Sequence, residues 1–376
     1  MGARSVREAG DIRGKRVFVR ADFNVPVRNG VILDTLRIEK AFSTLLFLKD
    51  KGAKIIIGSH TGDTGNETPA SVYEYIKNKF PDTLFSKTIV VDEELVRYTK
   101  NLAEGQILLL ENLRKNDGEK KNDDSYARAL ASLADIYVNE AFSASHRRHA
   151  SIVGAPKYLP HYAGDLFLEE LKNLGRAFNP EHPFVLVLGG AKFETKLPII
   201  KKFVDIADDI FVYGAPAHSF FKARGYETGV SLIDTTVDVS DMVSVKKIHI
   251  PFDVIVQNEK GREARVAGGV LSGECILDAG PESVRAIGEK LKNAKMVLWN
   301  GPLGDYEHGF GEGTVLLART IAESAAFSII GGGDTVAAIA NLKSSLREKF
   351  GFISTGGGAM LAYLAEGTLP GIEALK

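Results

Sequence analysis

The chain has 376 residues, of which 44% are hydrophobic and 25% charged, and this length suggests two domains of about 150–200 residues each. The formal net charge of −1 argues against a global positive field that would recruit nucleic acid or an anionic membrane. We therefore expect no nucleic-acid partner. The single cysteine, Cys275, is typical of a cytoplasmic protein, and the lack of an apolar run near the roughly 18 residues that span a bilayer predicts no membrane partner.

Strand-like apolar runs alternate with helical patterns from one end of the chain to the other. The runs lie at residues 16–20, 54–58, 107–110, 136–139, 184–188, 210–213, 254–257, 296–299, 327–330 and 352–354. Helices are predicted at residues 37–51, 125–133 and 281–293. In the last of these, Val284, Ile287 and Leu291 form an apolar stripe at helical spacing. The alternation predicts an α/β fold with mainly parallel sheets, in which ligands bind at the carboxyl ends of strands.

A proline-rich stretch between Pro156 and Pro183 marks the predicted domain boundary. It also contains Pro160 and Pro180, and between these outer pairs residues 166–174 have a helical pattern. A helix that joins two α/β domains would suit this position.

Four basic motifs in the first half of the chain each lie at or just beyond a strand-like run. Their residues are Arg20 with Asp22 and Asn24, then Arg37, then Arg114 after Glu111 and Asn112, and finally His146, Arg147, Arg148 and His149. Each arginine alone could be a solvated surface charge, but their repeated placement after strands favours bidentate contacts to a carboxylate or phosphate. The two histidines could suggest zinc. No third ligand cluster is evident, however, and the flanking arginines would repel a cation, so we favour an anion.

Two lysines follow a glycine turn in the second half. The run 184–188 leads into Gly189-Gly190, and Lys192 and Lys196 come four residues apart. If a helix starts at the glycines, both ammonium groups lie on one helix face, where they and the backbone N–H groups would meet a phosphate. The alternative is a surface helix with two solvated lysines.

A second glycine cluster, Gly331-Gly332-Gly333, follows the run 327–330 and precedes a helical pattern. Asp334 could cap that helix or hold Mg²⁺, and Thr335 offers a hydroxyl to a phosphate or to the helix end. Neither glycine cluster fits the P-loop or the dinucleotide-binding fingerprint, so both of those nucleotide-binding classes are disfavoured.

Taken in order, these motifs resemble the phosphoglycerate kinase family nearly end to end. The matching segments are residues 19–26, 59–60, 110–114, 139–142, 146–147, 189–192 with Lys196, 299–304, 331–335 and 354–359. The family transfers a phosphoryl group reversibly between 1,3-bisphosphoglycerate and ADP, giving 3-phosphoglycerate and ATP.

The resemblance implies two Rossmann-like three-layer α/β/α domains with mainly parallel sheets, joined by an interdomain helix and a hinge, in a monomer. Residues 1–160, with a returning tail at 359–376, would form the 3-phosphoglycerate domain. Residues 161–358, including the linking helix, would form the nucleotide domain. Because the carboxylate of 3-phosphoglycerate is itself the nucleophile, no strong general base is required.

The same resemblance assigns roles to individual residues. The residues expected to hold 3-phosphoglycerate are Asp22, Asn24, Arg37, His60, Arg114 and Arg147. Those expected to hold ATP or ADP are Lys196, Glu307 at the ribose, Gly332, Gly333, Asp334 with Mg²⁺, and Thr335. Those expected to act on the migrating phosphoryl group are Arg37, Lys192, Lys196, Gly332 and Gly333, chiefly by alignment and charge stabilisation.

The chain departs from the family pattern on both substrate sides. Asp63 replaces an arginine expected near the substrate phosphate and is expected to weaken 3-phosphoglycerate binding, for which Arg148 could compensate. On the adenine side, residues 213–218 replace a glycine-rich motif, with Pro216 and His218 in it, and Ile276 stands where the family often keeps glycine. These departures leave two alternatives open: a degenerate scaffold that binds nucleotide with little turnover, and a phosphotransferase for another acyl phosphate.

Overall fold

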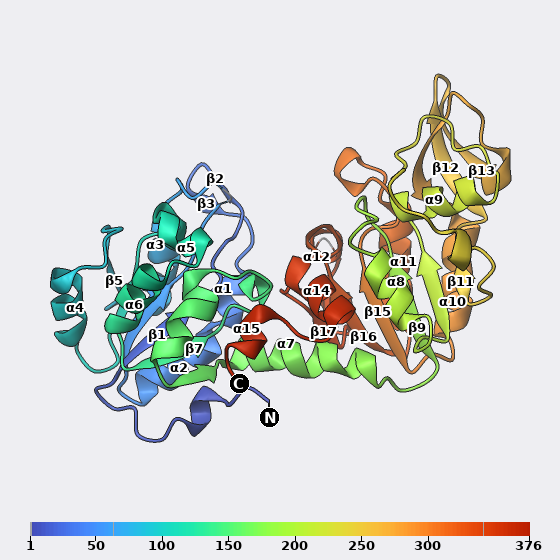
Figure 1. The fold of residues 1–376 in the computed structure, drawn as a ribbon. Coiled ribbons are helices and arrows are strands. Elements are labelled where there is room, and N and C mark those ends of the chain that lie inside the picture. The colour runs from blue at the N-terminus through green and yellow to red at the C-terminus, as the bar shows by residue number, and fades with distance from the viewer. Residues whose placement is uncertain (1, 63, 341) are drawn as a thin grey trace. The chain divides into compact units, whose positions relative to one another are not determined.

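The computed structural model describes residues 2–62, 64–340 and 342–376, and the chain forms two compact units (Figure 1). Unit 1 comprises the residues up to Lys172 together with Glu366–Lys376, and unit 2 comprises Asn173–Ala365. Helix α7 (Asp165–Gly175) contains the point at which the chain passes from one unit to the other.

Unit 1 is built on a six-stranded parallel sheet of order β5-β6-β4-β1-β7-β8. The strands are β1 (Arg16–Arg20), β4 (Lys54–Gly58), β5 (Leu84–Phe85), β6 (Ile107–Leu109), β7 (Ile136–Asn139) and β8 (His161–Ala163). The helices are α1 (Leu36–Lys40), α2 (Phe42–Asp50), α3 (Ala70–Lys79), α4 (Glu93–Lys100), α5 (Asp117–Lys121), α6 (Asp124–Ser132) and α15 (Pro370–Glu373). A short hairpin, β2 (Val27–Arg28) with β3 (Val31–Ile32), precedes α1.

Side chains that alternate along the unit 1 strands form a core on each face of the sheet. Val17 and Val19 of β1 belong to the cluster that also holds Leu45 of α2, whereas Phe18 stacks on Tyr137 of β7 on the opposite face. Strands buried on both faces explain the nearly continuous apolar runs in the sequence. The helix predicted at 37–51 is two helices, α1 and α2, separated at Ala41.

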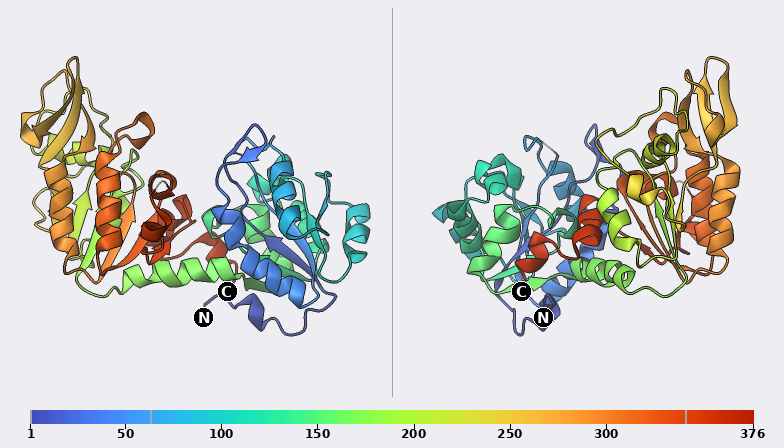
Figure 2. Two further views of the ribbon diagram at one scale, coloured as in Figure 1. Left: turned by 180° about the vertical axis from the view of Figure 1, so that it is seen from behind. Right: turned by 45° about the vertical axis from the view of Figure 1, so that its right-hand side comes forward.

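Unit 2 contains a second six-stranded parallel sheet, of order β11-β10-β9-β15-β16-β17. The strands are β9 (Phe184–Leu188), β10 (Asp209–Val212), β11 (Ile248–His249), β15 (Met296–Asn300), β16 (Phe327–Gly331) and β17 (Phe352–Ile353). The helices are α8 (Leu197–Phe203), α9 (Ala215–Ala223), α10 (Pro281–Leu291), α11 (Glu312–Glu323), α12 (Gly333–Ala340), α13 (Ser344–Arg347) and α14 (Gly358–Glu366). In each unit, helices cover both faces of the sheet, as two further views show (Figure 2).

The run predicted at 254–257 does not join the parallel sheet. It lies in β12 (Asp253–Asn258), the central strand of an antiparallel sheet with β13 (Gly261–Val266) and β14 (Cys275–Ala279). The α/β fold with mainly parallel sheets is otherwise confirmed. Among the described residues, no helix is long and apolar enough to cross a membrane.

Candidate active site

The carboxyl ends of β4, β1 and β7 bring polar residues to one edge of the unit 1 sheet. These strands are neighbours, and Arg20 is in register with both Gly58 and Asn139. Asp22 and His60, which follow β1 and β4, therefore emerge close together, with His60 Nδ1 3.5 Å from Asp22 Oδ1.

Asp22 is buried, with 6% of its surface exposed, and organises its neighbours. Its Oδ1 accepts the N–H of Asn24 at 3.0 Å, and its Oδ2 accepts hydrogen bonds from Arg37 Nη1 at 3.3 Å and from the Ser143 hydroxyl. Burial by itself would raise the pKa of Asp22. His60 in its protonated form, the charges of Arg37 and Arg20, and the Ser143 hydrogen bond outweigh burial and hold that pKa well below its usual range.

His60 is buried and neutral near pH 7. Burial lowers its pKa to about 4, and the charges of Arg20, Arg147 and Arg37 add to this effect against the opposing pull of Asp22. Arg20 Nη2 lies 3.4 Å from His60 Nδ1, and because a guanidinium only donates, that nitrogen is an acceptor. The two arginines nearest Asp22 therefore carry its stabilisation at neutral pH.

Arg114 carries hydrogen-bond donors without partners. It follows β6 in a short 3₁₀ turn, it is 6% exposed, and its Nη1 donates to the carbonyl of Gly62 at 2.8 Å. Its Nε and Nη2 are buried and have no partner among the described residues. Two unpaired donors on a buried cation are costly unless a ligand supplies acceptors, so this side chain points to an anion site.

The loop residues 59–62 are fixed by two asparagine side chains. Asn24 Oδ1 accepts the N–H of Gly62 at 2.8 Å, and Asn112 Nδ2 donates to the carbonyls of Thr61 and Glu67 at 2.7 and 2.9 Å. Asn24 is thus a positioning residue in this structure. Asp63, whose charge reverses the family pattern, lies outside the described residues.

Arg147 and His146 complete this group. Arg147 Nε donates to His146 Nε2 at 3.3 Å, and His146 Nδ1 is buried with no hydrogen-bond partner in the part of the chain that the structure describes. Arg147 also lowers the pKa of His60, so its charge lies near the buried cluster. Arg148 is exposed.

The sequence placed Arg20 in a basic motif but assigned it no role at the site, and it did not single out Glu119. Arg20 is fully buried, its Nε donates to the Ser151 hydroxyl at 2.7 Å, and its Nη2 lies 4.0 Å from Glu119 Oε1. Burial raises the pKa of Glu119 in spite of Arg20. The sequence did contain one indication of this pair: Arg20 ends a strand that is otherwise largely apolar, and a buried charge at that position needs a buried partner.

In unit 2, a cavity of about 680 Å³ opens beyond the carboxyl ends of β9, β10 and β15. Backbone hydrogen bonds join the segments that line it: Gly190 N–H donates to the Pro302 carbonyl at 2.7 Å, and Ala215 N–H donates to the Gly190 carbonyl at 3.1 Å. A Cβ on Gly189 would lie 2.2 Å from the Pro302 oxygen. Glycine is therefore required where these backbone segments meet.

The expected placement of Lys192 and Lys196 on one helix face is wrong. Helix α8 begins only at Leu197, with Pro198 in its first turn, so Lys196 is the residue before the helix and Lys192 lies in the preceding loop. The two charges are nevertheless close. Burial lowers the pKa of Lys196, Lys192 lowers it further, and Asp334 partly offsets both. Lys192, Lys196 and Asp334 thus form one charged group at the cavity.

The second glycine cluster supplies a turn and a helix start, as the sequence predicted. Gly332 has φ of +100°, Gly333 begins α12, and Asp334 is exposed and lines the cavity. Thr335 differs from expectation: it is fully buried, and its hydroxyl oxygen accepts the N–H of Gly301 at 2.8 Å. It therefore fixes the end of β15 to α12.

Glu307 also lines this cavity, from the 3₁₀ turn Tyr306–His308, and is exposed. Among the described residues, no group of three or more acidic, histidine or cysteine side chains could hold a metal. Asp334 alone would leave most of the coordination of Mg²⁺ to phosphate oxygens and water, as is usual for this ion in phosphoryl-transfer sites.

Comparison with known proteins agrees with this arrangement. A family sequence profile described as phosphoglycerate kinase matches residues 6–367. The phosphoglycerate kinase of Leptospira biflexa is 38% identical over 386 residues, covering 98% of this chain and 97% of the relative, and that of Dictyoglomus turgidum is 38% identical over 385 residues, covering 97% and 96%. The solved structure of the Coxiella burnetii phosphoglycerate kinase has a TM-score of 0.85 at 33% identity and covers 99% of this chain and 98% of that one.

Two α/β units, one with buried cations and one with a glycine-walled cavity beside lysines, define a phosphotransferase by class. The match extends over nearly the whole of this chain and of its relatives. The chain belongs to the phosphoglycerate kinase family.

Proposed function

We propose that this family member catalyses the reversible, Mg²⁺-dependent transfer of a phosphoryl group between 1,3-bisphosphoglycerate and ADP, giving 3-phosphoglycerate and ATP. The full-length family match supports the activity. The observation in the structure that carries the proposal is the buried Arg114 side chain, which keeps two unpaired donors for an anionic substrate and is anchored to the same Gly62 that Asn24 holds.

In unit 1, 3-phosphoglycerate is held by the six residues assigned from the sequence: Asp22, Asn24, Arg37, His60, Arg114 and Arg147. The arginines donate to the phosphate and carboxylate oxygens, and neutral His60 contributes a hydrogen bond without adding to the charge. Asp22 and Asn24 act by orientation, since Asp22 holds Arg37 and Asn24 holds Gly62.

A substitution of Arg114 tests this assignment. In Arg114→Met the KM for 3-phosphoglycerate should rise about 10- to 100-fold, because one bidentate contact is lost, while the thermal midpoint without substrate stays the same or rises. The stability argument is that the change removes a buried charge with two unpaired donors. Steady-state kinetics and thermal unfolding measure both effects. Arg97→Met on α4, an exposed arginine of the same unit, is the control. An unchanged KM in Arg114→Met would remove Arg114 from the site.

In unit 2, the nucleotide occupies the 680 Å³ cavity. Lys192, Lys196 and the N–H groups at Gly332 and Gly333 face its phosphates, and Glu307 meets the ribose. Thr335 supports this wall through Gly301. Asp334 fits Mg²⁺ because it is an exposed carboxylate that lines the cavity, and the bound ion would neutralise charge on the phosphates.

The transfer itself needs alignment and charge stabilisation more than covalent help from the protein. The carboxylate of 3-phosphoglycerate attacks the γ-phosphorus of ATP, the bond to the β-phosphate oxygen breaks, and the acyl phosphate and ADP form. We assign Arg37 and Lys192, with Lys196 and the Gly332–Gly333 amides, to the oxygens of the migrating group, where charge builds up. The enzyme acts as a monomer in the cytoplasm, a proposal that family resemblance and the single reduced cysteine support.

A coupled assay with ATP, Mg²⁺ and 3-phosphoglycerate tests the function. We expect ADP formation that depends on 3-phosphoglycerate and stops when EDTA removes Mg²⁺. No turnover together with measurable nucleotide binding would instead favour the scaffold alternative, for which the comparisons give no support. Turnover with another carboxylic acid and none with 3-phosphoglycerate would favour a different acyl phosphate.

A further inference from the structure

The unit 2 cavity has two chemically different ends. One end carries the charges of Lys192 and Asp334 beside the Gly190 turn. The rest of the lining is largely apolar and includes Phe221, Val230, Leu232, Val254 and Ile276, with Cys275 and the buried carboxyl group of Asp278 near Ile276 on β14. A nucleotide placed with its phosphates at the charged end would direct its base to the apolar end.

A single histidine interrupts the apolar end. His218 on α9 is 5% exposed, and its ring stacks on Phe221 with centroids 6.2 Å apart and planes 24° apart. Its Nδ1 lies 2.7 Å from the carbonyl oxygen of Leu232. Because a carbonyl oxygen only accepts, Nδ1 must carry the proton.

The remaining ring nitrogen of His218 is therefore an acceptor. Burial lowers the pKa of His218, so the ring is neutral near pH 7 and its Nε2 holds a lone pair. Nε2 has no hydrogen-bond partner among the described residues, although the side chain lines the cavity. A nearly buried ring fixed in one tautomer by Leu232 thus presents one unpaired acceptor at the base end.

The backbone N–H groups nearest this end of the cavity are not available as donors to a base. The N–H of Val230 donates to the Glu274 carbonyl at 2.9 Å, and that of Ser231 to the Thr228 carbonyl at 3.2 Å. The N–H of Ile276 donates to the Ser231 hydroxyl at 2.8 Å. These three groups are therefore committed within the protein. A base with a carbonyl oxygen at this end would find them occupied and would bury an unpaired acceptor.

We infer that His218 is a specificity-determining residue, which selects adenine nucleotides by accepting a hydrogen bond at Nε2 from the 6-amino group of the base. The inference rests on the proposed nucleotide site. Adenine has no carbonyl oxygen and bears an amino donor, which matches the unpaired acceptor on His218. Guanine would set its O6 against the Nε2 lone pair.

Calorimetric titration of the full chain with ADP and with purine riboside diphosphate, which lacks only the amino group, tests the inference. We expect the analogue to bind wild-type protein about three- to tenfold more weakly, and GDP more weakly still. In His218→Phe, which keeps a stacked ring without the acceptor, ADP and the analogue should bind equally. A purely structural role would weaken both ligands by the same factor and preserve their ratio.

Two results would overturn the inference. One is equal affinity of wild-type protein for ADP and the analogue, a comparison that needs no variant to fold. The other is an unchanged affinity ratio in folded His218→Phe. If the proposed nucleotide site itself is wrong, neither ADP nor the analogue would bind. That result is distinguishable from the two above, and it would overturn both the nucleotide site and the role of His218.

Discussion

Replacement of Arg37 with alanine should lower kcat about 10²- to 10³-fold at saturating substrates, with a much smaller effect on folding. Arg37 lies in the first turn of α1, where its Nη1 donates to the Asn24 carbonyl at 2.8 Å and to Asp22 Oδ2. Its side chain is 29% exposed, so one edge of the guanidinium is anchored while part of the side chain faces solvent. A planar, fixed cation of this kind stabilises charge on transferring phosphoryl oxygens without reorganisation.

The folding cost of this substitution should be about 1–2 kcal/mol. Asp22 loses a cation but keeps the Ser143 hydroxyl and the Asn24 N–H as partners. Arg37→Lys should recover only part of the lost rate, because an ammonium restores charge without the fork of donors. Steady-state kinetics with urea unfolding separates the two effects, and Arg28→Ala, an exposed arginine on β2, is the control. A kcat within twofold of wild type would exclude Arg37 from the transition state.

The sequence was most informative where one physical requirement decides the structure. Strands buried on both faces must be continuously apolar, so Phe184–Leu188 was predicted with the bounds that the structure has. The glycine positions also followed from a strict requirement: backbone segments that meet within van der Waals distance, as Gly189 and Pro302 do, leave no room for a side chain. Because each glycine cluster directly follows a strand-like run, the sequence also predicted that these turns lie at the carboxyl ends of strands.

The sequence was least informative where residues far apart in the chain decide the local structure. The spacing of Lys192 and Lys196 fits a helix, but α8 starts only at Leu197 with Pro198 in its first turn, and Phe193 in the loop before it packs against Phe220. The buried role of Thr335 depends on Gly301, a residue far away in the sequence. Likewise, the pairing of β12 with β13 and β14 depends on antiparallel partners, which the period of an apolar run does not identify.

Replacement of Lys192 with alanine should lower kcat about 10²- to 10³-fold and change the KM for ADP only slightly. The position of Lys192 in the structure supports this expectation. Lys192 is exposed at the cavity, close enough to lower the pKa of Lys196, and no ion pair with it is seen in the part of the chain that the structure describes. Because the Lys192 ammonium has no protein counter-ion, it can interact more strongly with the migrating phosphoryl group as negative charge builds up there. Lys196, beside Asp334, is expected to contribute to nucleotide binding in the ground state as well.

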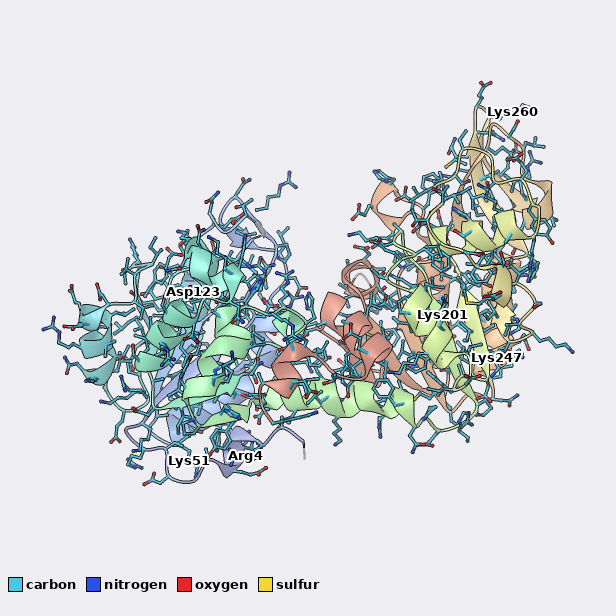
Figure 3. All side chains as sticks on the ribbon, in the orientation of Figure 1. Arg4, Lys51, Asp123, Lys201, Lys247 and Lys260 are labelled. Carbon is cyan, nitrogen blue, oxygen red and sulfur yellow. The ribbon has the colours of Figure 1, made fainter. Side chains whose placement is uncertain are left out.

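The same variant should raise the pKa of Lys196, since it removes a like charge while burial and Asp334 remain. An NMR titration of the lysine side chains measures this shift independently of turnover. Lys201→Ala, which removes an exposed lysine from α8 (Figure 3), should leave both kcat and the Lys196 titration unchanged. Wild-type kcat in Lys192→Ala would exclude it from catalysis. An unshifted Lys196 pKa would show that the two ammonium groups do not interact, and Lys192, which lines the cavity, would then act independently of Lys196.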